Sequence, residues 1–134
     1  MTDSLFAVLY KSRTSRAFSL SDLDRILDVA VSWNSAHGVT GLLLYGDAPH
    51  LPGIPGRFVQ WLEGPEAPVR ALYTRIERDH LHRDIETLAY GAARDLTGST
   101  DRLFSDWSMA ARRFGDLPST LHGFLDFARQ NALT

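Results

Sequence analysis

Short, almost continuously apolar segments recur along the chain and indicate strands that are buried on both faces. Such strands are expected at residues 5–10, 39–45, 57–63, 85–90 and 103–110. Three proline and three glycine residues fall within 46–57, so this stretch is expected to be a loop. The strands on either side of it would then form an antiparallel hairpin with a long connection.

Other segments carry the three- and four-residue periodicity of amphipathic helices. Ser19 or Ser21 can cap a first helix, and Gly38 stands where a helix commonly ends. Pro65 suits the first turn of a second helix, and Asp116 suits the cap of a last one. The inward positions of the three helices are Leu23, Leu27, Ala30 and Asn34; Val69, Leu72, Tyr73 and Ile76; and Leu121, Phe124, Leu125 and Phe127 or Ala128.

The order of these elements is strand, helix, strand, strand, helix, strand, strand and a final helix. This order predicts an α+β protein with a ferredoxin-like sheet, whose first two helices cover one face. Because the strands are apolar on both sides, the second face also needs a cover. The C-terminal helix is the element left for that role, and a partner subunit is the other candidate. We therefore expect a main domain at 1–112 and a capping helix at 113–134.

Three polar side chains occupy positions that the periodicity points toward the core. Asn34 continues the inward stripe of the first helix, Gln60 lies on an inward strand face, and Tyr10 ends the first strand. Trp61, on the opposite face from Gln60, is expected to pack under the last helix. Leaving a buried amide unpaired costs about 1–3 kcal/mol, so such groups are normally hydrogen-bonded. Two amides and a phenol could bond to one another, or they could enclose a polar, planar ligand.

Composition excludes several classes of function. The 134 residues carry a formal charge of −2 and no block of Lys or Arg, so nucleic acid is not an expected partner. There is no cysteine, which removes disulfides and thiolate chemistry. Residues 1–10 lack the pattern of a signal peptide, and no apolar run approaches the roughly 18 residues that span a bilayer. A cytoplasmic, single-domain protein without a membrane partner is expected.

Four blocks of the sequence match a known family in their order along the chain. They are LYKS at 9–12, GVTGLLLY at 38–45, FVQWLEGP at 58–65 and DWSM at 106–109. These blocks resemble those of BLUF domains, the sensors of blue light using FAD. The resemblance covers about residues 4–110, and the pair GVTGLLLY and FVQWLEGP is its most specific part.

The resemblance implies a flavin, FAD with FMN as the alternative, held without a covalent bond between the two helices and the sheet. The family's photoactive Tyr and Gln match Tyr10 and Gln60, and its flavin-binding Asn matches Asn34. Trp107 and Met109, on the last strand, would form the switching segment near Gln60, and Met109 would also contact the flavin. A glutamine amide suits such a switch, because turning or tautomerising it exchanges the donor and the acceptor that face the ring.

The resemblance also implies further contacts to the flavin. Arg75 and Asp79 match positions near the flavin on the second helix, and His82 matches a His in the loop that follows. Trp33 replaces the Asn or His that precedes the flavin-binding Asn, so its indole could stack on the ring or obstruct the pocket. Further departures from the family pattern, which together predict a less polar pocket, are Ala30, Val31, Ser32 and Leu81.

We therefore expect a short blue-light photoreceptor that is not an enzyme. Its Tyr10 and Gln60 hydrogen bonds would switch in light, and its signal would pass to a separate signalling protein or through a homo-oligomer. The alternative is a degenerate BLUF-like module that binds a protein partner without flavin. A third hypothesis, a small ferredoxin-like enzyme, would require turnover independent of light. His80 and His82 could ligate a metal, but no third ligand has a supporting spacing, so no metal is expected.

Overall fold

The computed structural model describes residues 5–14, 20–46, 56–79, 82–104, 109–114 and 117–130. The side chains of Leu20, Leu23, Leu27 and residues 109–114 lie outside this description. The elements in the described ranges are β1 (Leu5–Thr14), α1 (Leu20–His37), β2 (Thr40–Gly46), β3 (Arg57–Pro65), α2 (Glu66–Arg78), β4 (His82–Ala92), α3 (Ala93–Thr97), β5 (Met109–Phe114) and α4 (Leu121–Gln130). Across these ranges, no helix combines the length and the apolar character that crossing a bilayer requires.

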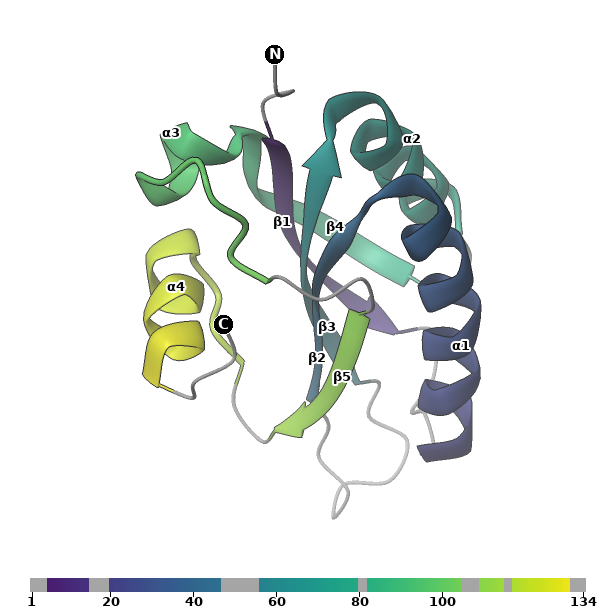
Figure 1. The fold of residues 1–134 in the computed structure, drawn as a ribbon. Coiled ribbons are helices and arrows are strands. Elements are labelled where there is room, and N and C mark those ends of the chain that lie inside the picture. The colour runs from purple at the N-terminus through teal and green to yellow at the C-terminus, as the bar shows by residue number, and fades with distance from the viewer. Residues whose placement is uncertain are drawn as a thin grey trace.

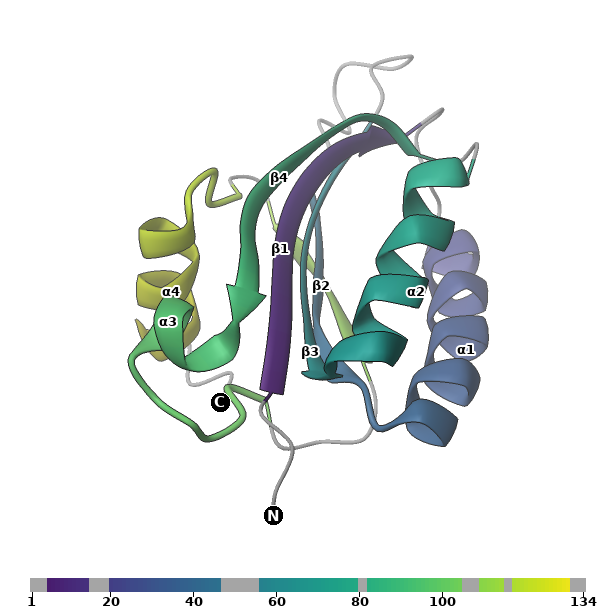
Figure 2. The same ribbon diagram turned by 90° about the horizontal axis from the view of Figure 1, so that it is seen from above.

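The strands form one sheet in the order β4-β1-β3-β2-β5, with β3 at its centre. Neighbouring strands are antiparallel except for β2 and β5, which are parallel. Helices α1 and α2 lie side by side on one face, and α3 and α4 lie on the other (Figures 1 and 2). The predicted α+β, ferredoxin-like fold is confirmed, and so is the C-terminal helix as the cover of the second face.

Alternation along the strands gives the sheet two apolar faces. On the face under α1 and α2, the core contains Phe6, Val8, Tyr10, Val39, Leu62, Val69 and Tyr73. On the face under α4, it contains Ala7, Leu9, Leu42, Leu44, Val59, Trp61, Phe124 and Leu125. The predicted packing of Trp61 is confirmed, because its indole stacks on the Phe124 ring with the centroids 5.8 Å apart.

The end of α1 meets the start of α2 at two glycines. Gly38 ends α1 with a φ of 72°, a left-handed conformation that costs glycine little, as the sequence predicts. At Gly64 a Cβ atom would lie 2.7 Å from the carbonyl oxygen of Gly38, so no larger residue fits without movement. Pro65 is the N-cap of α2 and not a residue of its first turn. The two helices therefore run antiparallel, as Figure 2 shows.

All five strands differ in their bounds from the expected ones. β1 runs to Thr14, so Tyr10 lies inside this strand and not at its end. β4 begins at His82, which therefore lies in a strand and not in the loop that the sequence predicts. The fifth strand is β5 at 109–114, whereas the sequence predicts 103–110. Leu103 and Phe104 are not in a strand because their backbone N–H groups donate to the carboxylate of Glu63, at 3.0 and 2.7 Å. The Glu63 side chain of β3 thus takes the N–H groups that would otherwise bond to the backbone of a neighbouring strand.

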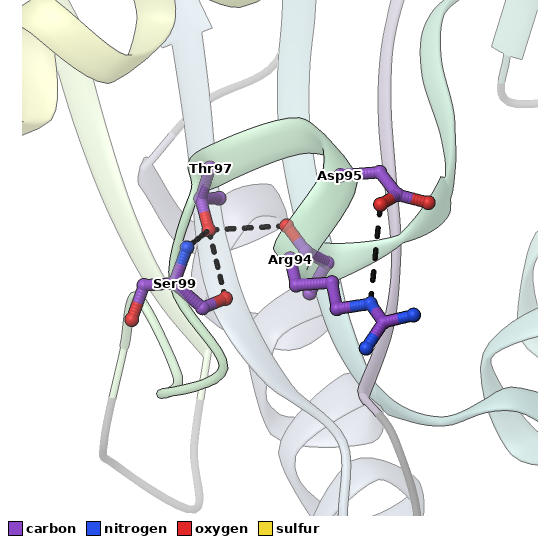
Figure 3. Close-up of polar contacts among 5 residues, drawn as sticks. Arg94, Asp95, Thr97 and Ser99 are labelled. Atoms are coloured by element: carbon purple, nitrogen blue, oxygen red, sulfur yellow. Dashed lines mark hydrogen bonds and ion pairs between the residues drawn. The ribbon is translucent and has the colours of Figure 1, made fainter.

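The helices after β4 also differ from expectation. The sequence does not predict α3, a short helix whose Thr97 hydroxyl donates to the carbonyl of Ala93 and accepts from the N–H of Ser99 (Figure 3). The last helix begins at Leu121, where the Thr120 hydroxyl accepts from the N–H of Gly123 at 3.0 Å. Thr120 is therefore its cap. Asp116, the predicted cap, lies outside the described residues.

Candidate functional site

A cavity of about 690 Å³ lies between α1, α2 and the sheet. Its volume is within the range of about 300–1,000 Å³ that is usual for small-molecule and cofactor sites. The wall is formed by residues of α1 and α2, by Leu43 of β2, by Phe58 and Gln60 of β3, and by His82 at the start of β4. The site that the sequence predicts between the helices and the sheet is therefore an open space.

Tyr10 and Gln60 form the polar centre of the sheet surface beneath this cavity. The register of β1 against β3 pairs the two residues directly, and the Tyr10 hydroxyl donates a hydrogen bond to Gln60 Oε1. Tyr10 is fully buried. Burial raises the pKa of the Tyr10 phenol above its ordinary value, and the nearby Tyr73 and Asp79 raise it further. The phenol therefore stays protonated at neutral pH and can act as a donor.

Asn34 brings a second carboxamide to the cavity from α1. Its backbone carbonyl accepts from the N–H of Val39 at 2.9 Å, so the backbone closes the end of the helix. The side chain is 1% exposed, and within the described part of the chain its Oδ1 atom has no hydrogen-bond partner. A buried oxygen of this kind costs about 1–3 kcal/mol unless something donates to it. The unsatisfied oxygen beside an open cavity points to a missing ligand N–H group.

These residues fit the ring system of a flavin. Its pyrimidine part offers an N–H donor between two carbonyl acceptors, which matches a carboxamide that can accept and donate. Among the described residues Asn34 Oδ1 is an acceptor without a partner, and Gln60 lines the cavity with its Oε1 atom engaged by Tyr10, which leaves its amide nitrogen as the donor for a ligand. Leu43, Phe58 and Ile76 give the wall apolar surface for a flat aromatic ring.

His82 lies at one end of the cavity and contacts the residues around Tyr10. Its Nδ1 atom is 2.8 Å from the Ser12 hydroxyl, and its ring centroid is 5.9 Å from that of Tyr10 and 5.2 Å from that of Phe58. Burial lowers the pKa of His82, and Asp79 opposes this shift. The imidazole is therefore neutral at physiological pH. In the described ranges no three His, Asp or Glu residues gather as a metal site, and His80 lies outside them.

Trp33 lies in the wall of the cavity and leaves it open. Its indole stacks on the His37 ring, with the centroids 3.9 Å apart, and the Arg75 guanidinium lies 5.6 Å from the indole centroid. Trp33 and Arg75 both line the cavity, together with Asp79. Trp33 therefore lines the cavity without filling it, and its role toward a flavin stays a prediction.

The structure places the two residues of the predicted switching segment less completely. Met109 is the first residue of β5, where its backbone pairs with Gly41 of β2, but its side chain is not described. Trp107 lies outside the described residues. Seven predicted site residues thus meet at or next to one cavity, namely Tyr10, Trp33, Asn34, Gln60, Arg75, Asp79 and His82. Their roles toward a flavin stay predictions.

Sequence reasoning missed a buried carboxylate on the other face of the sheet. Glu63 is 0% exposed, and it accepts from Trp61 Nε1 at 2.8 Å as well as from the backbone of Leu103 and Phe104. Burial raises the pKa of Glu63, although these hydrogen bonds and the Arg102 guanidinium act in the opposite direction. The alternation of β3 could have revealed it, because Glu63 continues the inward face of Trp61.

Sequence reasoning also missed two arginines of the cavity wall, Arg25 of α1 and Arg78 of α2. Arg25 stands four and eight residues before Val29 and Trp33, which line the same cavity, so the helical spacing could have indicated it. Arg78 looks like part of a solvated helix face in the sequence, and in the structure it lines the cavity together with Arg75 of the same helix.

A family model described as BLUF, sensors of blue-light using FAD, matches residues 5–110. Among curated proteins, the photoactivated adenylate cyclase subunit alpha of Euglena gracilis is 32% identical over 109 residues, which are 75% of this chain and 10% of that protein. The chain therefore spans about a tenth of the length of this relative.

Solved structures show the same similarity. The dark-state structure of BlrB, a BLUF protein, has a TM-score of 0.67 and 29% identity, and the match covers 84% of this chain and 75% of BlrB. BlrP1 of Klebsiella pneumoniae, solved with FMN and cyclic diGMP, has a TM-score of 0.65 and 28% identity, covering 81% of this chain and 26% of BlrP1.

Proposed function

The chain belongs to the BLUF family, the sensors of blue light using FAD, and from this membership we propose that it is itself a blue-light photoreceptor. It holds a flavin non-covalently in the cavity between α1, α2 and the sheet. The observation that carries the proposal is the hydrogen bond from Tyr10 to Gln60 at the base of a cavity where the Asn34 oxygen has no partner among the described residues.

Different residues of the cavity contact different parts of the flavin ring. Asn34 accepts a hydrogen bond from the N–H group of the ring, and Gln60 donates one from its amide NH₂ to a ring carbonyl. Trp33 and Arg75 close the side of the cavity near α1 and α2. His82 and Asp79 close the end near β4. Sequence departures such as Ala30 remove polar groups near the ring, so the two carboxamides account for most of the polar recognition of the ring itself.

When bound, a flavin would supply absorption of blue light and an excited state that is a strong oxidant. The chain responds through the hydrogen bond between Tyr10 and Gln60. With Gln60 Oε1 held by Tyr10, the amide nitrogen is the half of the side chain available to the cavity. Turning the amide brings its carbonyl toward the cavity and its NH₂ toward Tyr10. A phenol oxygen can accept as well as donate, so Tyr10 satisfies Gln60 in both arrangements.

The signal leaves the cavity through the neighbours of Gln60. Trp61 is the next residue of β3 and faces α4, where it stacks on Phe124. Trp107 and Met109 complete this route as the switching segment before and at the start of β5. The relative named as a photoactivated adenylate cyclase supports a coupling of light to an effector. For this chain the receiver is a separate signalling protein or a second copy of the chain.

A flavin-free interaction module is the second candidate, and the open cavity favours the photoreceptor over it. In a module without a ligand, the buried Asn34 oxygen, which has no hydrogen-bond partner among the described residues, would be expected to bond to the protein itself. The third hypothesis, an enzyme, has less support. The Ser12 hydroxyl lies 2.8 Å from His82 Nδ1, but Ser12 is buried and is not among the residues that line the cavity, so this pair does not face a ligand there.

The direct test is absorption spectroscopy of the purified protein in the dark and under blue light. We expect a yellow protein whose flavin band shifts reversibly to the red. The Tyr10→Phe protein should keep the flavin and lose the shift, because the ring remains and the bond to Gln60 does not.

Tyr73→Phe is the matched control. The Tyr73 ring lies 5.5 Å from that of Tyr10, but its hydroxyl bonds to Thr87 and not to Gln60, so the shift should survive. A protein that remains colourless with added FAD and FMN would refute the photoreceptor. A normal shift in Tyr10→Phe would refute the role of Tyr10.

A further inference from the structure

Two arginines from different helices line the cavity, Arg25 of α1 and Arg78 of α2. Arg25 precedes Asn34 by nine positions on α1. At the α-helical rise of about 1.5 Å per residue, this separates the two positions by roughly 13 Å along the helix axis. The cavity therefore has a carboxamide at one end of its α1 wall and a guanidinium group toward the other.

The antiparallel packing of the helices places Arg78 at the same end as Arg25. The end of α1 contacts the start of α2, since a Cβ at Gly38 would lie 3.6 Å from Pro65 Cδ. The opposite ends, the start of α1 and the end of α2, consequently lie together (Figure 2). Arg78 is the last residue of α2, and it lines the cavity with Arg25. The Arg25 and Arg78 positions thus lie toward one end of the helix pair, and both residues line the cavity.

The charge of this wall is predominantly positive. Arg25, Arg75 and Arg78 line the cavity, and Asp79 is its acidic residue among those described. Within the described ranges, neither Arg25 nor Arg78 forms an ion pair. Arg75 lies against the indole of Trp33, so its position is already accounted for. Arg25 and Arg78 are the cations available to an anion at the cavity end.

We propose that Arg25 and Arg78 clamp the phosphate of a flavin nucleotide, so that the cavity selects FMN or FAD over riboflavin. The inference rests on the proposed function and extends it to the non-aromatic end of the ligand. With the flavin ring at Asn34 and Gln60, the ribityl chain leads away from the pyrimidine edge, and its terminal phosphate is the anion that a pair of guanidinium groups binds best.

The test compares riboflavin, FMN and FAD as ligands of flavin-stripped protein, by fluorescence quenching at low and at physiological salt. We expect FMN to bind about tenfold more tightly than riboflavin, the gain of one charge-assisted contact to exposed guanidinium groups. Added salt should narrow this margin. If FAD and FMN both bind more tightly than riboflavin by the same factor, the clamp holds the phosphate on the ribityl chain. A larger factor for FAD would show that its second phosphate is held as well.

Arg25→Met and Arg78→Met should each reduce the margin and leave the affinity for riboflavin unchanged. Arg94→Met is the matched control, because Arg94 lies on α3, outside the cavity, with its Nε atom 3.9 Å from Asp95 (Figure 3). It should bind all three flavins as the unaltered protein does.

Three results would overturn the clamp, and they differ in what else they refute. Equal binding of riboflavin and FMN, with a normal light-induced shift, refutes the clamp and leaves the photoreceptor standing. An equal loss of riboflavin and FMN affinity in Arg25→Met and Arg78→Met shows that these residues support the ring or the cavity shape instead. Failure of every flavin to bind refutes both the clamp and the proposed function.

Discussion

Burial determines the protonation of side chains on both faces of the sheet. On the cavity side, it raises the pKa of the Tyr10 phenol, which therefore keeps the proton that it shares with Gln60. On the α4 side, it raises the pKa of Glu63, whose carboxylate is surrounded by N–H donors. Tyr10 needs its proton to donate a hydrogen bond. Glu63 accepts with both oxygens, but because burial raises its pKa, its ionisation lowers the stability of the folded protein.

Replacing Glu63 by Gln should change how stability depends on pH. Because burial raises the pKa of Glu63 above its ordinary value of 4.5, the folded protein binds this proton more tightly than the unfolded chain. The resulting stability is fully present below that value and is lost as the pH rises through the folded pKa. The free energy of unfolding of the unaltered protein minus that of Glu63→Gln should therefore fall as the pH rises, and then level off.

Urea unfolding at a series of pH values, followed by tryptophan fluorescence, measures this difference. All other titrating groups are common to the two proteins and cancel, apart from local effects. A difference that stays constant or grows with pH would show that the folded pKa of Glu63 is not raised. The absolute difference also contains the loss of one acceptor oxygen, since the amide NH₂ faces donors from Trp61 or from the 103–104 backbone.

At the scale of elements, the sequence predicts what periodicity controls. The apolar runs and helical stripes place β1, α1, β2, β3 and α2, and with them the inward positions of Tyr10, Asn34 and Gln60. These positions depend on local spacing, so the polar centre of the site could be found without a structure. The family resemblance then gives those residues a flavin as their ligand.

The elements after β4 depend on contacts between distant residues, and the sequence predicts them less well. Leu103 and Phe104 are apolar enough for a strand, but the Glu63 carboxylate takes their N–H groups, and the strand starts at Met109. Thr120 caps α4, and α3 consists of five residues that show no helical period of their own. The local sequence pattern around Leu103 cannot indicate that the Glu63 carboxylate, 40 positions earlier in the sequence, binds its N–H group.

The junction of α1, β3 and α2 provides a test at this scale. In Gly64→Ala, the added Cβ would lie 2.7 Å from the carbonyl oxygen of Gly38 and 3.2 Å from Val39 Cα. Both are backbone atoms, so the elements must separate, and we expect a loss of about 1–3 kcal/mol in the free energy of unfolding. Urea unfolding measures it.

Gly123→Ala in α4 is the comparison for this change. Its Cβ would meet the Thr120 hydroxyl at 3.0 Å, a side chain that can move, and the better helix propensity of alanine offsets the contact by about 1 kcal/mol. A much smaller loss is expected there. An equally small loss for Gly64→Ala would show that the junction is not as tightly packed as its distances indicate.

At the scale of the whole molecule, β3 connects two helical layers. Gln60 faces the cavity, and Trp61 faces α4, where the Phe124 ring stacks on it and the Phe104 ring lies 6.3 Å from Phe124. A change at Gln60 therefore reaches the second face within one residue. The division into 1–112 and 113–134 stays a prediction, and β5 extends to Phe114. The proposed relay makes α4 the output of the sensor.

Phe124→Leu tests this relay in the intact protein. The substitution removes the aromatic stack on Trp61 and keeps an apolar side chain at a fully buried position. We expect the light-induced absorption shift to be unchanged, because Tyr10 and Gln60 are on the other face. The difference between light and dark in hydrogen exchange at the α4 amides should become smaller, because the contact that carries the change to α4 is weakened.

Tyr90→Leu controls for the loss of an aromatic ring, since Tyr90 lies on the edge strand β4, is 45% exposed and packs against Phe6 under the other helical layer. If α4 exchanges identically in light and dark in the unaltered protein, the output does not pass through α4. If Phe124→Leu retains the full difference, the coupling runs through other residues, and the Arg102–Phe104 segment held by Glu63 becomes the route to test.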